Sequence, residues 1–161
     1  MKIKIRKPIK TDGKEIYNLV KDTKVLDLNS EYLYLLQSTY FSDTSAVAID
    51  DGKVIGFVSA FIEPKKQTDL FIWQVAVDEK YRGKGVAKDI IEYLLEQQND
   101  IQYINATISP SNTSSEKLFL KVSKSLQTNI ELEKIYDVND FNHAHEDEIL
   151  YKIGPLEKEK K

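Results

Sequence analysis

Cysteine is absent from this chain of 161 residues, and histidine occurs only twice. Without cysteine the protein can form no disulfide, no thiolate metal site and no cysteine nucleophile. His143 and His145 are too few and too close together to predict a metal site, so we expect none. Any acyl transfer must therefore pass straight to the acceptor or use a nucleophile other than a thiol.

Long apolar runs and an excess of positive charge are also lacking. No apolar run approaches the roughly 20 residues of a membrane span, and the net charge is −3 with no long basic run. We therefore expect neither a membrane nor a nucleic-acid partner, and a cytoplasmic location. The composition, 41% hydrophobic and 30% charged, is typical of a globular chain. We predict one domain over residues 1–155 and a flexible charged tail over 156–161.

Hydrophobic periodicity predicts seven strands and four helices. Their order is strand, two helices, three strands, helix, strand, helix and two strands, which predicts an α/β (mixed α+β) fold with helices on both faces of a mostly antiparallel mixed sheet of about six to seven strands. Thr11 and either Asn29 or Ser30 are candidate caps of the first two helices. Gly56, inside a strand, indicates a close contact or a bend. The predicted strands are residues 2–7, 45–49, 54–62, 70–77, 102–109, 130–138 and 148–153, and the helices begin near residues 11, 30, 86 and 112.

The central feature is the segment 70–95, in which an apolar strand, a glycine turn and an amphipathic helix follow one another. Gly83 and Gly85 allow a tight turn and a close approach of a ligand to the backbone. The amides at the start of the next helix are unpaired and carry a partial positive charge. Strand, glycine turn and helix N-terminus together predict a phosphate-binding site.

Three known phosphate loops compete as interpretations of this segment, and a simple turn is the fourth. A dinucleotide fingerprint would need a third glycine and a place in the first strand–helix unit, and a Walker A sequence is absent. Arg82-x-x-Gly85-x-Ala87, preceded by Val75-x-Val77, resembles instead the pyrophosphate loop of the GNAT superfamily of N-acetyltransferases. That resemblance implies a V-shaped splay after the central strand and acetyl-CoA as cosubstrate. It implies cofactor contacts from Gln74, Val75, Ala76, Val77, Arg82, Gly83, Lys84, Gly85, Val86, Ala87 and Asn112.

Further segments resemble one GNAT subfamily, the L-2,4-diaminobutyrate acetyltransferases of ectoine biosynthesis. The specific ones are D-L-N-S at 27–30, W-Q at 73–74 and H-E-D-E at 145–148, and the likeness runs from about residue 26 to 155. The resemblance implies transfer of acetyl from acetyl-CoA to the γ-amine of diaminobutyrate, as a step toward a compatible solute. Homodimers are common in this family, so we expect one here.

A diamino acid is cationic at its amines, so its site should offer carboxylates. We predict that Asp27 holds an ammonium group, with a helix-cap or turn aspartate as the alternative. We favour Glu148 as carboxylate anchor or proton acceptor and His145 as a polar lining residue, against a solvated strand end. Trp73 can line the pocket beside a cationic amine, or it can simply pack in the core. Tyr32 can orient the substrate. The catalytic assignments are thus Glu148, Trp73 and Asp27.

One position departs from the GNAT pattern. Many GNAT enzymes carry a general-acid tyrosine seven residues after the motif asparagine, and here Asn112 is followed at that distance by Phe119. Either another group protonates the leaving thiolate, or it leaves unassisted, as a thiol pKa near 8.5 allows. Two rival functions stay open: a GNAT enzyme for another small amine, such as a polyamine, an amino acid or an aminoglycoside, and a non-catalytic CoA-binding module.

Overall fold

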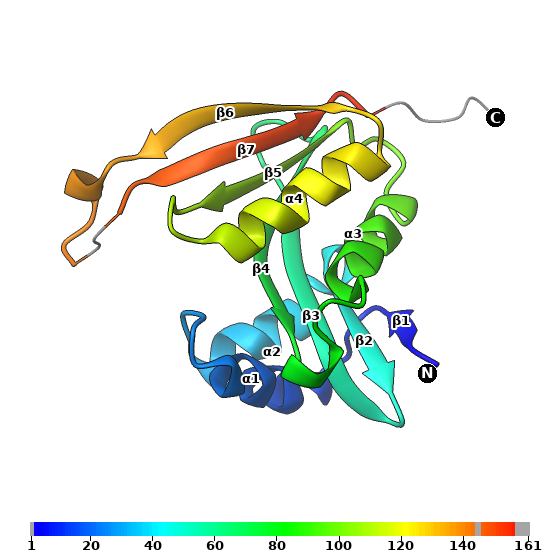
Figure 1. The fold of residues 1–161 in the computed structure, drawn as a ribbon. Helices are drawn as coiled ribbons and strands as arrows, with labels where there is room; N and C mark the ends of the chain where they lie inside the picture. The colour runs from blue at the N-terminus through cyan, green and yellow to red at the C-terminus, as the bar shows by residue number, and fades with distance from the viewer. Residues whose placement is uncertain (1, 144–145, 157–161) are drawn as a thin grey trace. The chain divides into compact units, whose positions relative to one another are not determined.

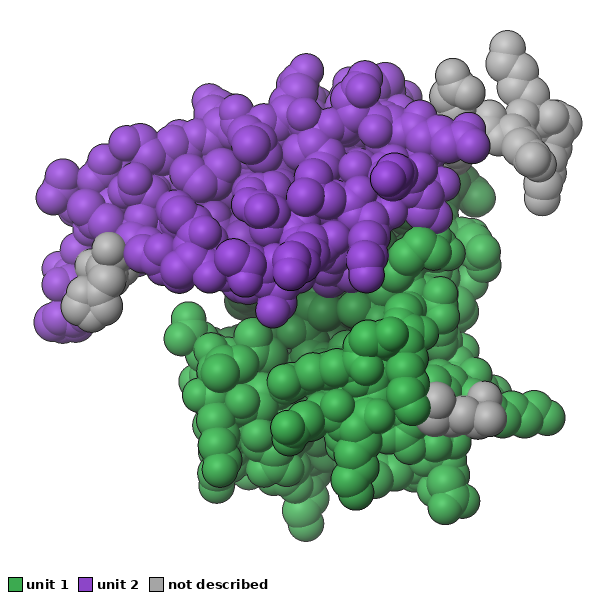
Figure 2. Space-filling view, in the orientation of Figure 1, with its two compact units in different colours: residues 1–61, 72–99 green, residues 62–71, 100–161 purple. Residues whose placement is uncertain are grey.

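The computed structural model describes residues 2–143 and 146–156. The chain divides into two compact units, which Figure 2 shows in different colours. Unit 1 comprises residues 1–61 and 72–99, and unit 2 comprises residues 62–71 and 100–161. His145, one of the predicted substrate residues, lies outside the described residues.

The elements follow one another as the periodicity predicts, and Figure 1 labels them. The strands within the described residues are β1 (Lys4–Arg6), β2 (Ala46–Asp50), β3 (Lys53–Ile62), β4 (Asp69–Val77), β5 (Tyr103–Ile108), β6 (Asn129–Tyr136) and β7 (Glu148–Gly154). The helices are α1 (Asp12–Thr23), α2 (Glu31–Thr39), α3 (Val86–Glu96) and α4 (Thr113–Ser125), with short 3-10 helices η1 (Ser42–Thr44), η2 (Glu79–Tyr81) and η3 (Val138–Asp140).

The strands form a mixed sheet with the order β1-β2-β3-β4-β5-β7-β6, which confirms the predicted fold class. The pairs β1–β2, β2–β3, β5–β7 and β6–β7 are antiparallel. The β4–β5 pair is parallel, with a ladder that joins Asp69–Phe71 to residues 103–105, while β4 itself runs on to Val77. Parallel pairing requires a crossover connection between the two strands. That crossover contains η2 and α3, and it carries the predicted phosphate loop.

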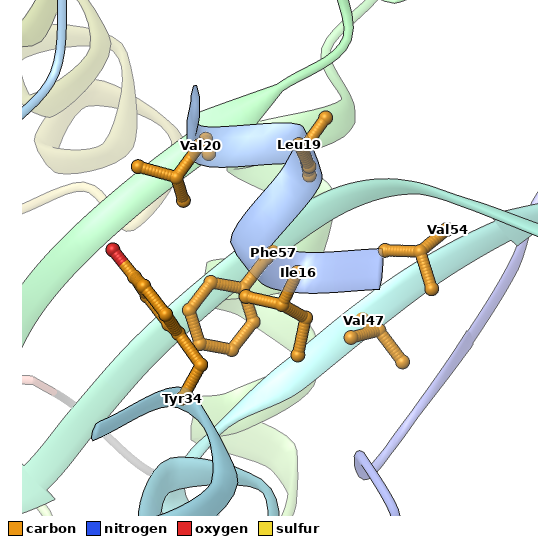
Figure 3. Close-up of a cluster of buried hydrophobic side chains, with 8 residues drawn as sticks. Ile16, Leu19, Val20, Tyr34, Val47, Val54 and Phe57 are labelled. Carbon is orange, nitrogen blue, oxygen red and sulfur yellow. The ribbon is translucent and has the colours of Figure 1, made fainter. Parts of the chain in front are cut away.

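Figure 3 shows an apolar cluster of unit 1, on the face of the sheet that α1 and α2 cover. Ile16, Leu19 and Val20 recur along α1 at helical spacing and are at most 7% exposed. They meet the fully buried ring of Tyr34 from α2 and strand residues that include Phe57. Helices α1 and α2 therefore bury their apolar stripes against β2, β3 and β4.

Helix α3 covers the other face of β3. Adjacent strand residues point to opposite faces, so Gly56 faces away from the cluster that contains Phe57. A Cβ at Gly56 would lie 3.1 Å from Cγ1 of Val86 and 3.2 Å from Cδ1 of Ile90. The close contact that the sequence predicted at Gly56 is therefore confirmed, and it lets α3 approach the sheet.

The helix caps partly correct the sequence analysis. Ser30 is the cap of α2, because its Oγ accepts a hydrogen bond from the Leu33 amide at 3.2 Å. Thr11 occupies the N-cap position of α1, but its side chain makes no cap hydrogen bond. The Thr11 backbone is already helical, at φ −68° and ψ −16°, rather than in the extended conformation from which an N-cap side chain accepts from the first helix amides, so the predicted cap bond does not form. The neighbouring Asp12 carboxylate accepts instead from the amide of Ile9, before the helix, at 2.8 Å.

Unit 2 consists of the start of β4, the strands β5, β7 and β6, and helix α4 (Figure 1). Ile104, Ala106 and Ile108 alternate along β5 and are buried, as are Phe119 and Val122 on α4. Strand β6 is at the edge of the sheet and is largely exposed.

Candidate functional site

The loop after β4 has the conformation that the glycine turn predicted. Gly83 and Gly85 have φ angles of +76° and +78°, in the left-handed region that residues with a Cβ adopt only with strain. Before them, Asp78 caps η2 by accepting from the Lys80 amide, and Nε of Arg82 donates to the Val77 carbonyl at 3.3 Å. These contacts join residues close in the sequence, and two longer-range hydrogen bonds, from the Asp78 amide to the Ile55 carbonyl and from the Tyr81 hydroxyl to Asp50, tie the loop to β3 and β2.

The start of α3 is open for a ligand. Its N-cap is Gly85, which offers no side chain to bind the first amides of the helix. A Cβ built on Gly83 or Gly85 would meet nothing within 4 Å, so open space lies beside both glycines. Unpaired helix amides next to open space fit the phosphates of acetyl-CoA.

The lysines near this loop differ in the groups that their ammonium groups contact. Lys88 forms an ion pair with Glu92 at 2.9 Å, and that contact raises the pKa of Lys88. Lys84 lies over the ring of Tyr81, with Nζ 5.9 Å from the ring centroid. Lys80 lines a cavity of about 410 Å³ in unit 1, which lies beside the loop. That cavity is lined by Glu15, Asn18, Leu19, Asp22, Thr23, Lys53, Val54, Val77, Asp78, Glu79, Lys80 and Arg82.

The segment 24–30 between α1 and α2, here called the Asp27 loop, holds its aspartate in the open. The Asp27 side chain is exposed, and its carboxylate forms no hydrogen bond or ion pair with any described residue. The alternative of a capping aspartate is excluded for α2, because Ser30 caps that helix. The backbone of the loop is fixed nonetheless: the Asp27 carbonyl accepts from Nε2 of Gln74 at 2.9 Å. A fixed backbone with an open carboxylate suits a cation-binding role.

Trp73 and Tyr32 are both open to solvent in unit 1. Trp73 is 43% exposed, so simple core packing, the alternative considered for it, does not describe its environment. Its ring stands edge-on to Phe61, with centroids 5.9 Å apart, which fixes its orientation. Tyr32 is 68% exposed on α2. Both side chains can therefore reach a ligand.

The acidic run near the start of β7 divides into different roles within unit 2. Glu146 accepts hydrogen bonds from the amide and hydroxyl of Ser111, so it secures the turn before α4. Asp147 accepts from the Val138 amide at 2.9 Å and lies 3.9 Å from Nζ of Lys134. Glu148 is half-buried and lines a cavity. Among these carboxylates Glu148 is thus the one placed beside a ligand-sized space.

That cavity of unit 2 has a volume of about 520 Å³. Its wall combines two carboxylates with the rings of Tyr136 and Phe141, which stand edge to face with centroids 6.2 Å apart. Carboxylates and aromatic faces are both favourable surroundings for an ammonium group. The lining residues are Thr107, Ile135, Tyr136, Asp140, Phe141 and Glu148.

Asn112 and Phe119 lie on α4. Asn112 caps the helix, because its Oδ1 accepts from the Ser115 amide at 3.1 Å. Phe119 is 3% exposed and packs in the core. The nearby hydroxyl of Tyr151 donates to Glu116 at 3.1 Å, and burial together with this carboxylate raises the Tyr151 pKa. Asn112 therefore has a structural role as the cap of α4, and Phe119 has the buried position of a core residue.

Several of these residues could not be predicted as site residues from the sequence. Tyr136 lies in the predicted strand 130–138, Asp140 and Phe141 follow it, and the aromatic spacing there is the available signal. The contact between Tyr34 and Gln74 gives no local signal, because it joins positions 40 residues apart. No helix among the described residues is long and apolar enough to span a membrane. Residues 2–143 and 146–156 contain no group of three or more potential metal ligands.

The profile of the acetyltransferase (GNAT) family matches residues 13–123. An L-2,4-diaminobutyric acid acetyltransferase of Virgibacillus pantothenticus is 46% identical over 152 residues, which cover 92% of this chain and 96% of the relative. The enzyme of the same name from Shouchella clausii is 41% identical over 155 residues, 94% and 86% of the two chains.

A solved structure is similar over almost the whole length. It is diaminobutyrate acetyltransferase EctA from Paenibacillus lautus, in complex with its substrate L-2,4-diaminobutyric acid and coenzyme A. It superposes with a TM-score of 0.92 at 36% identity and covers 99% of both chains. The family match, the relatives and this structure agree with the loop geometry at the start of α3. The chain belongs to the acetyltransferase (GNAT) family, in which it is similar along its length to the L-2,4-diaminobutyric acid acetyltransferases.

Proposed function

We propose that this protein transfers the acetyl group of acetyl-CoA to the γ-amine of L-2,4-diaminobutyrate. The product is N4-acetyl-L-2,4-diaminobutyrate, and the reaction is the one that ectoine biosynthesis requires. The observation that carries the proposal is the similarity over 99% of the chain to an enzyme that binds both L-2,4-diaminobutyric acid and coenzyme A. The open Asp27 carboxylate and the acidic, aromatic cavity at Glu148 support it, because both suit a cationic acceptor.

We assign acetyl-CoA to the segment from β4 to α3. The amides at the start of α3, next to Gly83 and Gly85, hold the phosphates, and Arg82 and Lys84 add positive charge. Val75 and Val77 pair with the pantetheine arm through their backbone groups, as a further strand would. Asn112 contributes a hydrogen bond to that arm from its remaining donor atoms, while its Oδ1 caps α4. The cofactor set also includes the backbones of Gln74, Ala76, Val86 and Ala87.

We assign the acceptor to five side chains. Asp27 and Glu148 attract its ammonium groups, and the exposed face of Trp73 stabilises a neighbouring cation. Tyr32 orients the substrate by its hydroxyl group, and His145 is a polar lining residue. Anchoring the α-substituents presents only the γ-amine to the thioester, so regioselectivity follows from positioning.

The first step of the reaction is removal of a proton from the ammonium group of the acceptor. An alkyl ammonium group has a pKa near 10, so at neutral pH the acceptor amine must lose a proton before it can attack. Glu148 takes this proton, directly or through a water molecule. The amine then attacks the thioester carbonyl, and backbone N–H groups of residues 74–77 donate to the oxyanion. No acyl-enzyme on cysteine is available, and with phenylalanine at position 119 the thiolate leaves without a tyrosine acid.

We propose that the chain folds as a single acetyltransferase domain over residues 1–155, that it forms a homodimer, and that it works in the cytoplasm on small molecules. No nucleic-acid or membrane partner is part of this proposal. The net charge of −3 supports the exclusion of nucleic acid, and the homodimer rests on the resemblance to the family.

The test is CoA release from acetyl-CoA in parallel reactions with L-2,4-diaminobutyrate, ornithine, lysine and spermidine, followed by mass spectrometry of the product. Strong preference for diaminobutyrate with the acetyl group on the γ-nitrogen is the expected result. Turnover with another amine would keep the acetyltransferase and discard the acceptor assignment. Release with none of these amines, despite binding of CoA, would favour a non-catalytic CoA-binding module.

A further inference from the structure

A chain of hydrogen bonds in unit 1 joins the central strand to the loop that carries Asp27. The amide of Asn29 donates to the hydroxyl of Tyr34 at 3.3 Å, and that hydroxyl donates to Oε1 of Gln74 at 3.0 Å. Nε2 of Gln74 donates in turn to the carbonyl of Asp27 at 2.9 Å. We call these three hydrogen bonds the Gln74 clasp.

The directions of these bonds are mutually consistent. The Tyr34 hydroxyl accepts from a backbone amide, so its single proton is left to donate to a carbonyl-type oxygen. Oε1 of Gln74 is that oxygen, which leaves Nε2 as the donor toward Asp27. A glutamine supplies one acceptor and one donor in this way, and neither glutamate nor methionine at position 74 can do both.

The clasp rests on a rigid base. Tyr34 is fully buried, and its ring stands edge to face with Tyr17 and Phe57, with centroids 6.2 and 6.3 Å away. Figure 3 shows the ring inside the apolar cluster with its hydroxyl at the edge. Gln74 is held by the pairing of β4 in the sheet. The loop is further anchored by Leu26, which packs against the same cluster.

The clasp holds the backbone of the Asp27 loop and leaves the carboxylate open. The bonds reach the Asp27 carbonyl and the Asn29 amide, whereas the Asp27 side chain touches no described partner. A carboxylate that must bind a cation gains from this arrangement, because its backbone is ordered before the ligand arrives.

We propose that Gln74 is a positioning residue, which acts through the Asp27 loop on acceptor binding and whose side chain takes no part in binding coenzyme A. The inference rests on the proposed function of Asp27 and goes beyond it. Gln74 follows Trp73 in β4, so this strand carries both a proposed acceptor residue and the residue that fixes the Asp27 loop. Tyr34 is the buried residue whose hydroxyl links Gln74 to the Asn29 amide of the loop.

The experiment compares Tyr34→Phe and Gln74→Met with Tyr40→Phe as the matched control. Tyr34→Phe removes one hydroxyl and keeps the packed ring, and Gln74→Met keeps the length of a half-buried side chain. Tyr40 is 85% exposed, is the C-cap residue of the same helix, α2, and lies outside the clasp. We expect either clasp variant to raise the KM for L-2,4-diaminobutyrate by about 10-fold and to change the KM for acetyl-CoA by less than about 2-fold. Tyr40→Phe should change neither.

Combination with Asp27→Asn separates positioning from general destabilisation. If the clasp acts through Asp27, the loss caused by Asp27→Asn should be smaller in the Gln74→Met background than in the wild type. Full additivity of the two losses would overturn the proposal, as would an equal rise in the KM for acetyl-CoA.

Hydrogen exchange gives a readout that needs no acceptor. The amide of Asn29 should exchange about 10-fold faster in Tyr34→Phe than in the wild type, with the amides of α3 unchanged. Unchanged exchange at Asn29 would overturn the clasp whatever the substrate. A wild type that leaves diaminobutyrate untouched but acetylates another amine would overturn the proposed acceptor, and the same KM comparison would then be made with that amine.

Discussion

The loop after β4 and the Asp27 loop belong to the same unit, yet they are held by different kinds of interaction. The first is fixed by two glycines with positive φ and by contacts such as Arg82 to the Val77 carbonyl, five positions apart. The second depends on Gln74, which bonds to the Asp27 carbonyl across 47 positions. The glycine turn is thus specified mainly by neighbouring residues, although the Tyr81 hydroxyl also ties its loop to Asp50 of β2, whereas the Asp27 loop is held to the central strand only when the fold has formed.

This difference matches what the two loops are proposed to bind. A phosphate group needs backbone amides and little else, so a short motif suffices and recurs among proteins with different acceptors. An amino acid acceptor needs charges at set distances, which must be carried by segments that the fold brings together. The specificity of such an enzyme should therefore be sensitive to residues far from its motifs.

The largest expected effect is at Gly85, where the substitution Gly85→Val should raise the KM for acetyl-CoA by about 100-fold or more. Valine is strained at a φ of +78°, and its side chain would fill the open space beside the helix amides. The KM for the acceptor should change far less. Steady-state kinetics with each substrate varied in turn measures this.

Gly52→Val is the matched control for that loop. Gly52 has a φ of +72° and nothing within 4 Å of a built Cβ, so the backbone strain is alike, but it lies in the β2–β3 turn. It should lower the melting temperature and leave the affinity for acetyl-CoA intact. Equal losses of acetyl-CoA affinity in both variants would mean that strain alone, not a ligand site, explains Gly85.

The second effect is at Glu148, whose replacement by glutamine should lower kcat by about 100-fold. Glutamine keeps the shape of the side chain and cannot accept the proton of the acceptor amine. Asp147→Asn is the control, because Asp147 already accepts a hydrogen bond from the Val138 amide and lies near Lys134. If Asp147→Asn lowered kcat as much as Glu148→Gln, the assignment of the base to Glu148 would fail.

The sequence was sufficient for most of the fold. Helical and strand periodicities predicted the strands and α-helices in their correct order. The reason is that the buried face of each element consists of residues close in the sequence, such as Ile16, Leu19 and Val20. Gly56 predicted the close approach of α3 from its place in a strand. The missing Thr11 cap bond could not be predicted from residue type, because capping needs an extended N-cap backbone and that of Thr11 is helical.

Only the part of the candidate site that depends on neighbouring residues could be predicted from the sequence. The glycine turn is a local motif, so the positive φ angles at Gly83 and Gly85 could be predicted, while the cofactor contacts stay a prediction. Within the acidic run, nothing local separates Glu146 from Glu148, and only the fold places Ser111 against the first and a cavity beside the second. Tyr34 gave no signal at all, since its partner Gln74 is on a distant strand.

A third, smaller effect is expected at Asp27. Asp27→Ala should raise the KM for diaminobutyrate by about 10-fold and leave binding of CoA nearly intact, because the side chain has no partner in the described structure to lose. Asp100→Ala removes another exposed carboxylate and should change neither constant. A collapse of CoA binding in Asp27→Ala would show that the two loops do not bind separate substrates. The assignment of CoA to one loop and the acceptor to the other would then be wrong.

The smallest effect on activity is expected at Asp12, which lies in unit 1 outside both loops. Its carboxylate accepts two hydrogen bonds from Arg6, at 2.7 and 3.0 Å, and one from the Ile9 amide. Burial raises the pKa of this carboxyl group, but the bonds from Arg6 and Ile9 outweigh burial, and the pKa lies below its ordinary value. A lowered pKa means that the stabilisation is present above the ordinary aspartate pKa near 4 and is lost as the pH falls through the lowered value.

Asp12→Asn should therefore lower the free energy of unfolding by about 1–3 kcal/mol at pH 7 and leave the KM of both substrates unchanged. The difference in stability between wild type and variant should shrink as the pH falls below about 4, because the wild type then loses the same charge. Denaturant unfolding at a series of pH values measures this, and kinetics at pH 7 completes it. A rise in either KM would mean that loss of stability in unit 1 reaches its binding loops, and the effects at Gly85 and Asp27 would then have to be corrected for it.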